Sequence, residues 1–232
     1  MRRIPSGLAV LILIPAAAGA VALSLLAGDT RLEDLTRQIV LEYRLPRGVL
    51  AFPVGASLGA SGVCFQGLFR NALADPYVVG VSGGAALGAV GTILLGLNAS
   101  VLGMAPATGA AFLGALVAAF LAWNLARVGG RVPVTTLLLA GSAIGAFAGA
   151  LVSLLILFHA PQWSEVMAWL MGSMAHPDPW ARVKVVLPCL VLSAGAMAVY
   201  ARDLNLLILG EEPAQQLGVE TERLKLVLLG AG

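Results

Sequence analysis

The fold of this chain is decided by residues 55–88, GASLGASGVCFQGLFRNALADPYVVGVSGGAALG. Two apolar halves rich in small residues flank a short polar break, RNALADP, at residues 70–76. Within the halves, glycines recur four residues apart, a spacing that lets the backbones of neighbouring membrane helices approach closely. The stretch therefore predicts two tightly packed membrane helices joined by a polar turn. The residues of this turn that we single out are Arg70, Asn71, Asp75 and Pro76.

The composition places the chain in the membrane class. Of its 232 residues, 59% are apolar and 11% are charged, whereas a soluble domain carries about a quarter charged residues. The formal net charge of +2, without any basic cluster, gives no indication of a nucleic-acid partner. We therefore expect an all-α, polytopic transmembrane helical bundle whose surroundings are the lipid bilayer.

Few residues are available for a metal site. Cys64 and Cys189 lie in apolar runs, and the chain has two histidines and no CxxC motif. A thiol in an apolar run is typically a small buried hydrophobe. We therefore predict that both cysteines are buried and that they form neither a disulfide nor a metal site.

Apolar runs long enough to cross the bilayer core, about 20 residues each, divide the chain into spans. Six are predicted, at 8–27, 48–68, 78–97, 107–126, 134–158 and 180–200, and a seventh begins at 224. Segments 29–47 and 159–179 are expected to be interfacial, with Pro46 ending one helix and beginning the next. Segment 202–223 is polar and predicts a short helix at 212–217. Residues 1–232 are expected to form a single transmembrane domain.

The orientation follows from the distribution of lysine and arginine. With the N-terminus in the cytoplasm, eight of these residues lie inside and six outside, which favours that topology. The polar turn at 70–76 and segment 202–223 are then cytoplasmic, and segments 29–47 and 159–179 are extracytoplasmic. An incomplete seventh helix cannot cross a bilayer, so we expect the sequence to be part of a longer protein.

Small residues at helical spacing continue in the fifth predicted span. We expect them to allow close helix packing or to line a path between helices. The positions are Gly55, Gly59, Ser61, Gly62, Gly80, Ser82, Gly84, Gly88, Gly141 and Gly145.

Two serines lie in sequences that resemble the GxSG motif of rhomboid-like intramembrane serine proteases. Such a nucleophile needs a histidine base within hydrogen-bonding reach. The two histidines, His159 and His176, both fall in a predicted extramembrane segment. A packing role for Ser61 and Ser82 is therefore favoured, and a protease is kept as an alternative.

Ionisable residues at the middle of a span usually mark an ion or proton pathway. The sequence has none there, which argues against a secondary transporter, the other alternative that we retain. A GxxxxGK[ST] loop for binding ATP phosphates is also absent. These patterns favour a passage that is driven by a separate protein.

Several stretches resemble the FecCD permease family, the membrane subunits of ABC importers for ferric siderophores, haem and vitamin B12. The stretches, in family order, are 44–47, 55–62, 66–76, 80–88, 138–141, 167–172, 204–212 and 216–218. They extend over nearly the whole chain. Members of this family have ten spans, however, and the last four have no counterpart in this sequence.

The resemblance implies a transport subunit without catalytic residues or a cofactor of its own. Its implied partners are a second permease subunit, two ATP-binding cassette subunits that use ATP, and an extracytoplasmic substrate-binding protein. The implied location is the inner membrane of a prokaryote, and the implied mechanism is alternating access. Arg44 and Arg47 match the arginines that dock the binding protein. The ATPase-coupling helices are matched by Leu204, Asn205, Leu206, Leu207, Gly210, Glu211, Glu212, Gln216, Leu217 and Gly218.

Overall fold

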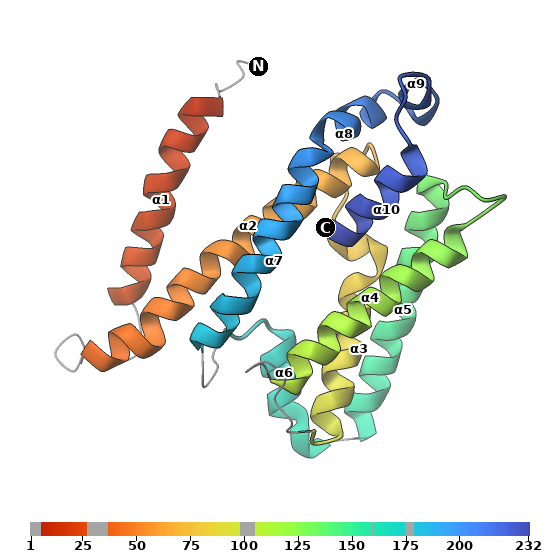
Figure 1. Ribbon diagram of the computed structural model, residues 1–232. Helices are drawn as coiled ribbons and strands as arrows, with labels where there is room; N and C mark the ends of the chain where they lie inside the picture. The colour runs from red at the N-terminus through yellow and green to blue at the C-terminus, as the bar shows by residue number, and fades with distance from the viewer. Residues whose placement is uncertain (1–5, 27–36, 98–104, 159, 175–178) are drawn as a thin grey trace. The chain divides into compact units, whose positions relative to one another are not determined.

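The computed structural model describes residues 6–26, 37–97, 105–158, 160–174 and 179–232. These residues are almost entirely helical, and the only β-pairing among them is a single bridge between Val128 and Arg131. The all-α prediction is confirmed. In chain order the helices are α1 (Ser6–Leu26), η2 (Ile39–Arg44), α2 (Leu45–Leu68), η3 (Pro76–Val79), α3 (Val81–Leu94), α4 (Pro106–Ala126), α5 (Val134–Phe158), η4 (Ala160–Gln162), α6 (Trp163–Leu170), α7 (Pro179–Val199), α8 (Ala201–Ile208), α9 (Glu211–Gln216) and α10 (Thr221–Ala231) (Figure 1).

Four helical segments of the described chain are long and apolar enough to cross a membrane. They are Ile39–Leu68, Pro106–Ala126, Val134–Phe158 and Trp180–Val199. Two shorter apolar helices, Leu11–Ser24 and Val81–Leu94, accompany them. Each of the six lies within or across one predicted span, and α5 has the predicted bounds.

The third span is shorter than predicted, because its beginning takes another conformation. Residues 76–79 form the 3₁₀-helix η3, and Gly80 follows with a left-handed φ of 81°. This turn delays α3 until Val81, and the helix also ends at Leu94, three residues before the predicted end, so that α3 has 14 residues. At 1.5 Å per residue it is about 21 Å long, less than the bilayer core of about 30 Å.

The helix boundary predicted near Pro46 is wrong. Residues 29–36 lie outside the described part of the chain, but η2 is a π-helix that continues into α2 without a break. The Leu45 N–H donates to the Val40 carbonyl across the junction. Pro46 lies inside this continuous helix, and because it has no N–H it leaves a backbone carbonyl of the preceding turn without its helical donor. What changes at this point is the type of helix.

The structure divides into two compact units, of which the first comprises Met1–Ala56 and Met174–Pro188. In this first unit α1 approaches α2 closely at Gly48, where an added Cβ would lie 3.1 Å from the Ser24 hydroxyl oxygen. The Trp180 indole N–H donates to the Leu41 carbonyl over 3.4 Å. Leu50 and Val183 are buried here.

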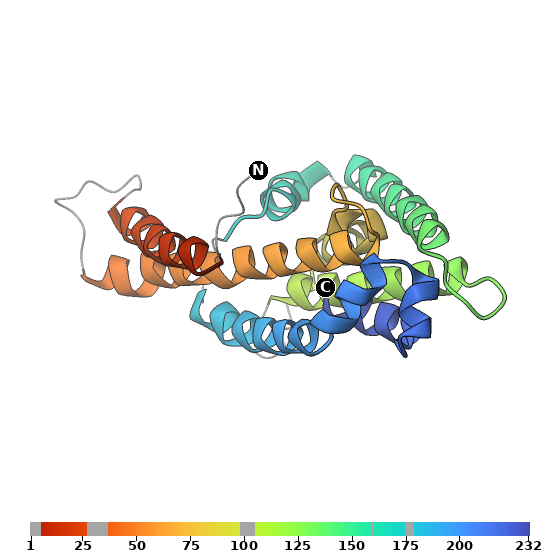
Figure 2. The same ribbon diagram turned by 90° about the horizontal axis from the view of Figure 1, so that it is seen from above.

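The second unit comprises Ser57–Ser173 and Cys189–Gly232. At its centre α3 packs against α4 and α5, and the three helices lie side by side in both ribbon views (Figures 1 and 2). Gly84 and Gly88 face Gly114 and Ala110 of α4, close enough that a Cβ on either glycine would collide with backbone. The small residues of α3 therefore permit backbone contact between helices, as expected for a membrane bundle.

The other side of α3 approaches α5 in the same way. A Cβ at Gly80 would lie 2.5 Å from the Gly141 carbonyl oxygen, and one at Gly83 would lie 2.9 Å from that of Gly145. Gly83 was not among the predicted positions. The glycines at 80–88 and 141–145 thus join three helices into one layer.

The first half of the quoted stretch does not pack as predicted. A Cβ at Gly55, Gly59 or Gly62 would meet nothing within 4 Å. Within the described chain, tight packing of the two halves against each other is therefore wrong, because the second half packs against α4 and α5. A role for these three glycines along a path or against another chain remains a prediction.

Candidate functional site

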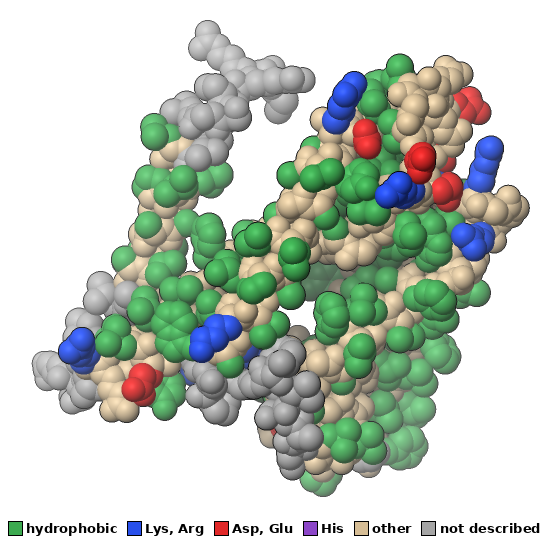
Figure 3. All heavy atoms as spheres, in the orientation of Figure 1, with side chains coloured by type: hydrophobic (Ala, Val, Ile, Leu, Met, Phe, Trp, Pro, Cys, Tyr) green, Lys and Arg blue, Asp and Glu red, His purple; other side chains and the backbone are tan. Residues whose placement is uncertain are grey.

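Most charged residues of the second unit gather at one end of it, with Glu165 on α6 as an exception. On the face drawn in Figure 3, acidic and basic side chains cluster around α8, α9, α10 and the turn between α4 and α5. The adjoining surface of α4 and α5 is covered mainly by hydrophobic side chains. Such a division is typical of a bundle whose apolar flank faces lipid and whose end faces water.

The polar turn at 70–76 is built from local hydrogen bonds. The Asn71 Oδ1 atom accepts from the Leu73 N–H at 2.9 Å, and the Asp75 Oδ1 atom accepts from the Tyr77 N–H at 2.8 Å. Asp75 is the N-cap of η3, and Pro76 begins that helix. Arg70 has a φ of 49°, which is uncommon for a residue other than glycine. The turn therefore has a defined shape that its own side chains maintain.

Segment 201–218 forms two short helices with a sharp corner between them. At the corner Gly210 has φ 134° and ψ 157°, a conformation that is essentially restricted to glycine. The helix predicted at 212–217 is α9, one residue earlier at each end, and Gly218 follows it with φ 87°. The glycines at 210 and 218 thus define both ends of α9.

Buried residues hold these helices against the rest of the second unit. Leu207 and Ala214 are fully buried, and Leu204 lies against Gly67 near the end of α2. The remaining predicted coupling residues divide by exposure. Gly210 is buried, Leu206 and Glu211 are half-buried, and the exposed ones are Asn205, Glu212, Gln216, Leu217 and Gly218.

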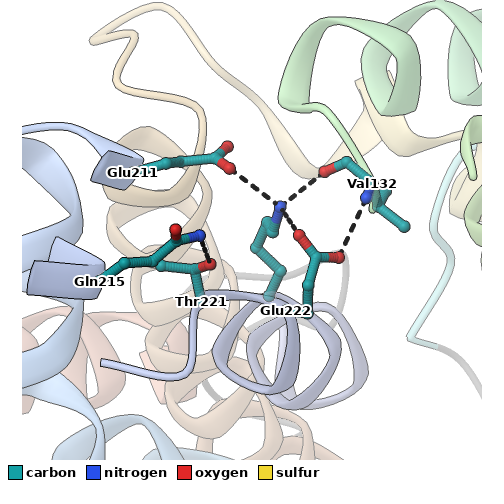
Figure 4. A network of polar contacts seen from close by, with 6 residues as sticks. Val132, Glu211, Gln215, Thr221 and Glu222 are labelled. Carbon is teal, nitrogen blue, oxygen red and sulfur yellow. Dashed lines mark hydrogen bonds and ion pairs between the residues drawn. The ribbon is translucent and has the colours of Figure 1, made fainter. Parts of the chain in front are cut away.

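A buried ionic network, which the sequence did not predict, joins this segment to the α4–α5 turn (Figure 4). The Lys225 side chain is fully buried, and its Nζ atom donates to the Val132 carbonyl at 2.6 Å. The same amine pairs with the Glu211 carboxylate at 3.3 Å and with the Glu222 carboxylate at 2.5 Å. We call Lys225, Glu211, Glu222 and Val132 the lysine network.

Glu222 closes the lysine network by a second contact with the turn. Its Oε2 atom accepts from the Val132 N–H at 3.0 Å, so that one residue of the turn binds to both charges. Beside it, the Gln215 Nε2 atom donates to the Thr221 Oγ1 atom at 2.8 Å, which joins α9 to the start of α10. The Lys225 side chain is fully buried, whereas the side chains of Glu211 and Glu222 are 29% and 35% exposed, so the network is centred on one buried charge.

Part of this network could be recognised in the sequence, from the spacing of its charged residues and the surroundings of Lys225. Glu222 and Lys225 are three residues apart, which places them on the same face of a helix. Lys225 also stands alone in an apolar run, where a charge needs a partner. In the sequence it was counted only as a cytoplasmic charge. That Glu211 and Val132 would join it depends on the tertiary fold.

Arg44 and Arg47 belong to the first unit. Arg44 ends η2 and is half-buried, whereas Arg47 lies in the first turn of α2 and is exposed. Docking of a binding protein by these two arginines remains a prediction.

The two serines occupy different environments. Ser61 is 7% exposed, and its hydroxyl lies within hydrogen-bonding distance of the backbone carbonyls of Ser57 and Gly232, at 2.8 and 2.7 Å. Ser82 is half-buried in the first turn of α3. His159 and His176 lie outside the described residues. The contacts of Ser61 with main-chain oxygens are those of a hydroxyl that ties helices together.

The expectation that both cysteines are buried holds for Cys64 and is wrong for Cys189, which is exposed on α7. The inference from an apolar run to burial fails here because an apolar residue of a membrane helix can face lipid. Both thiols are free, and the described residues contain no group of three side chains that could bind a metal.

Comparisons with known proteins match nearly the whole chain. A family model described as the FecCD transport family matches residues 7–232. The cobalamin import system permease protein BtuC of Halobacterium salinarum is 44% identical over 196 residues, covering 84% of this chain and 52% of that protein. The hemin transport system permease protein HmuU of Yersinia pestis is 39% identical over 215 residues, covering 87% and 60%.

The fold is similar to that of a solved structure described as an inward-facing conformation of a metal-chelate type ABC transporter. The TM-score is 0.80 at 29% sequence identity, over 95% of this chain and 70% of that one. The chain spans little more than half the length of the first curated relatives that it matches.

Proposed function

The chain belongs to the FecCD transport family, and from this membership we propose that it is the membrane-spanning part of an ATP-driven importer. The observation that carries the proposal is the family match over residues 7–232 together with relatives that are named as permeases of import systems. The sequence contains no phosphate-binding loop, so that ATP hydrolysis falls to a separate subunit. The chain acts as a transport subunit and not as an enzyme.

The cargo that we propose is a metal chelate or corrinoid too large for a narrow pore. The similar proteins are named for cobalamin, hemin, ferric citrate and iron hydroxamate import. Glycine and serine along the helices leave room for such a ligand between subunits, where Gly55, Gly59 and Gly62 have open space within this chain. A second permease subunit completes the passage, and alternating access moves the ligand.

The proposed ATPase contact is the segment formed by α8 and α9. Leu207 and Ala214 anchor it in the second unit while Glu212 and Leu217 remain exposed. A short helix fixed at its base and free at its outer face is suited to transmit a rigid-body displacement. ATP-driven closure of the cassette subunits moves this segment and thereby switches the access of the path.

The proposed contact for the substrate-binding protein is formed by Arg44 and Arg47. Helix α2 has 24 residues, about 36 Å at 1.5 Å each. That length exceeds the bilayer core of about 30 Å, so the two ends of α2 can reach opposite membrane surfaces. Arginine suits the docking task because its guanidinium pairs bidentately with carboxylates.

Reversal of both arginines tests the docking proposal. Arg44→Glu with Arg47→Glu is expected to weaken binding of the substrate-binding protein through repulsion of its acidic residues. Affinity is measured by pull-down with the cognate substrate-binding protein. Exchange of the exposed Lys184 for glutamate in the same unit is the matched control. Equal affinity of the double variant and the wild type would contradict the docking role.

The transport function is tested in proteoliposomes. The full transporter, reconstituted with its cassette subunits and binding protein, is expected to accumulate a ferric siderophore, hemin or cobalamin only when ATP is present. Uptake that persists without ATP hydrolysis but is abolished by a proton uncoupler would overturn the proposal in favour of a secondary transporter. Accessibility of introduced cysteines at Arg44 and Arg127 to an impermeant maleimide tests the orientation, with an N-terminus in the cytoplasm expected.

A further inference from the structure

The lysine network joins the proposed ATPase-contact segment to a part of the chain that the proposed function does not use. Glu211 begins α9, Glu222 and Lys225 lie in the first half of α10, and Val132 lies between α4 and α5. These three segments are separated by up to 93 residues in sequence. Charged groups at one buried point therefore hold three different parts of the chain together.

We propose that Lys225 is a positioning residue that clamps α9, α10 and the α4–α5 turn into one mechanical body. This inference rests on the proposed function, since it assigns the route by which displacement of α9 reaches the membrane helices. The turn leads directly into α4 and α5, and both helices pack against α3. A displacement of α9 is thus delivered to the α3–α5 layer through the clamp.

The contacts of the amine support a structural link. Lys225 donates hydrogen bonds to the Val132 carbonyl and to the Glu211 carboxylate, and it forms an ion pair with Glu222. With its side chain fully buried, Lys225 also has no access to water or to a partner protein.

The geometry further favours coupled movement over independent movement of the segments. Glu222 accepts from the Val132 N–H while Lys225 donates to the Val132 carbonyl, so both main-chain polar groups of Val132 are held by α10 (Figure 4). Separating the turn from α10 would break both hydrogen bonds together and remove one acceptor from the buried amine. Such a separation is disfavoured, and the segments are expected to move together.

The test uses a pair of substitutions that removes the clamp without leaving a fully buried charge, since the remaining Glu211 side chain is 29% exposed. Lys225→Met with Glu222→Met replaces both charges by apolar side chains of similar length, a change that often preserves folding. The control is Arg223→Met with Glu220→Met, an exposed pair on the same helix at the same spacing. Both double variants are studied in the full transporter, with uptake and ATP hydrolysis measured together.

The clamp variant is expected to hydrolyse ATP but to transport about tenfold less substrate per ATP, the effect of losing a coupling of ordinary size. The control is expected to keep the wild-type ratio of transport to hydrolysis. An unchanged ratio in a clamp variant that assembles with its cassette subunits would overturn the proposal. A wild-type transporter without ATP-dependent uptake would refute the proposed function and leave the second measurement to decide the clamp.

That second measurement requires no transport. Spin labels at Val128→Cys and Leu217→Cys, both exposed positions, report the distance between the turn and the end of α9 in the purified permease. Cys64 and Cys189 are first replaced by alanine. A narrow distance distribution in the wild type that broadens in the clamp variant is expected. Equally narrow distributions in both proteins would refute the clamp, whether or not the variant assembles.

Discussion

Replacing Gly84 with alanine is expected to destabilise the second unit by forcing α3 away from α4. The added methyl group would lie 2.6 Å from the Ala118 Cβ atom and would also collide with the Gly114 carbonyl. Ordinary contact between such atoms requires about 3.5–4.0 Å. Neither opposing group can rotate away, since one is backbone and the other is a methyl group on a helix. The two helices must therefore separate locally by about 1 Å.

A gap of this size reduces the packing energy of the whole contact. A radial gap of about 0.5–1 Å forfeits about a quarter to a half of each dispersion contact. Overpacking of this kind costs about 1–3 kcal/mol, from which the higher helix propensity of alanine recovers a part, up to about 1 kcal/mol. We expect a net loss near 2 kcal/mol, equivalent to a fall in melting temperature of about 4–8 °C for a chain of this length.

Thermal unfolding of the purified protein in detergent measures the effect. Gly91→Ala is the matched control, because Gly91 lies in the same helix and an added Cβ there would meet nothing within 4 Å. That variant is expected to be as stable as the wild type or slightly more stable. If Gly84→Ala melted at the same temperature as Gly91→Ala, close backbone contact between α3 and α4 would be refuted.

Three further substitutions test other features. Gly210→Ala is expected to cost about 1–3 kcal/mol of stability because a φ of 134° strains any residue with a side chain. It is also expected to reduce ATP-driven uptake. The control for the thermal melt is Gly195→Ala, at an unstrained position in α7. Asp75→Ala is expected to cost about 1 kcal/mol of stability through loss of the N-cap. Asp75→Asn keeps an acceptor for the Tyr77 N–H and is expected to be more stable than the alanine variant. Equal melting temperatures of the two variants would contradict the capping role. Ser82→Ala is expected to retain ATP-driven uptake, and labelling of Ser82 by a fluorophosphonate would instead support a protease.

Sequence patterns predicted the membrane helices well where hydropathy alone determines the bounds of the helix. The bounds of α5 were predicted correctly because a stretch without charged residues lies between Pro133 and the polar segment at 159. The start of α3 was missed because hydropathy does not distinguish a 3₁₀-helix from an α-helix. Gly80 lies at the junction, and its left-handed φ ends the 3₁₀-helix η3 before the α-helix α3 begins.

The partners of the small residues were less predictable than their positions. A four-residue spacing indicates that a helix is approached closely, but it does not identify the approaching helix. Gly84 and Gly88 therefore predicted a contact whose actual partner is α4 and not α2. The lysine network was missed for a similar reason, since Val132 contributes only main-chain atoms, which no side-chain pattern reveals.

The π-helical start of the long helix at Ile39–Leu68 sets the angular phase of everything before it. A π-turn holds one residue more than an α-turn, and one residue corresponds to about 100° of rotation about the helix axis. A helical wheel drawn in one α-helical register through residues 37–68 would therefore misplace the azimuth of Arg37, which precedes η2, relative to α2. Deleting a single residue from η2 would relax this segment to an α-helix and turn the preceding chain by about that angle. The direction in which Arg37 points thus depends on the extra residue of η2 as well as on its own position in the sequence.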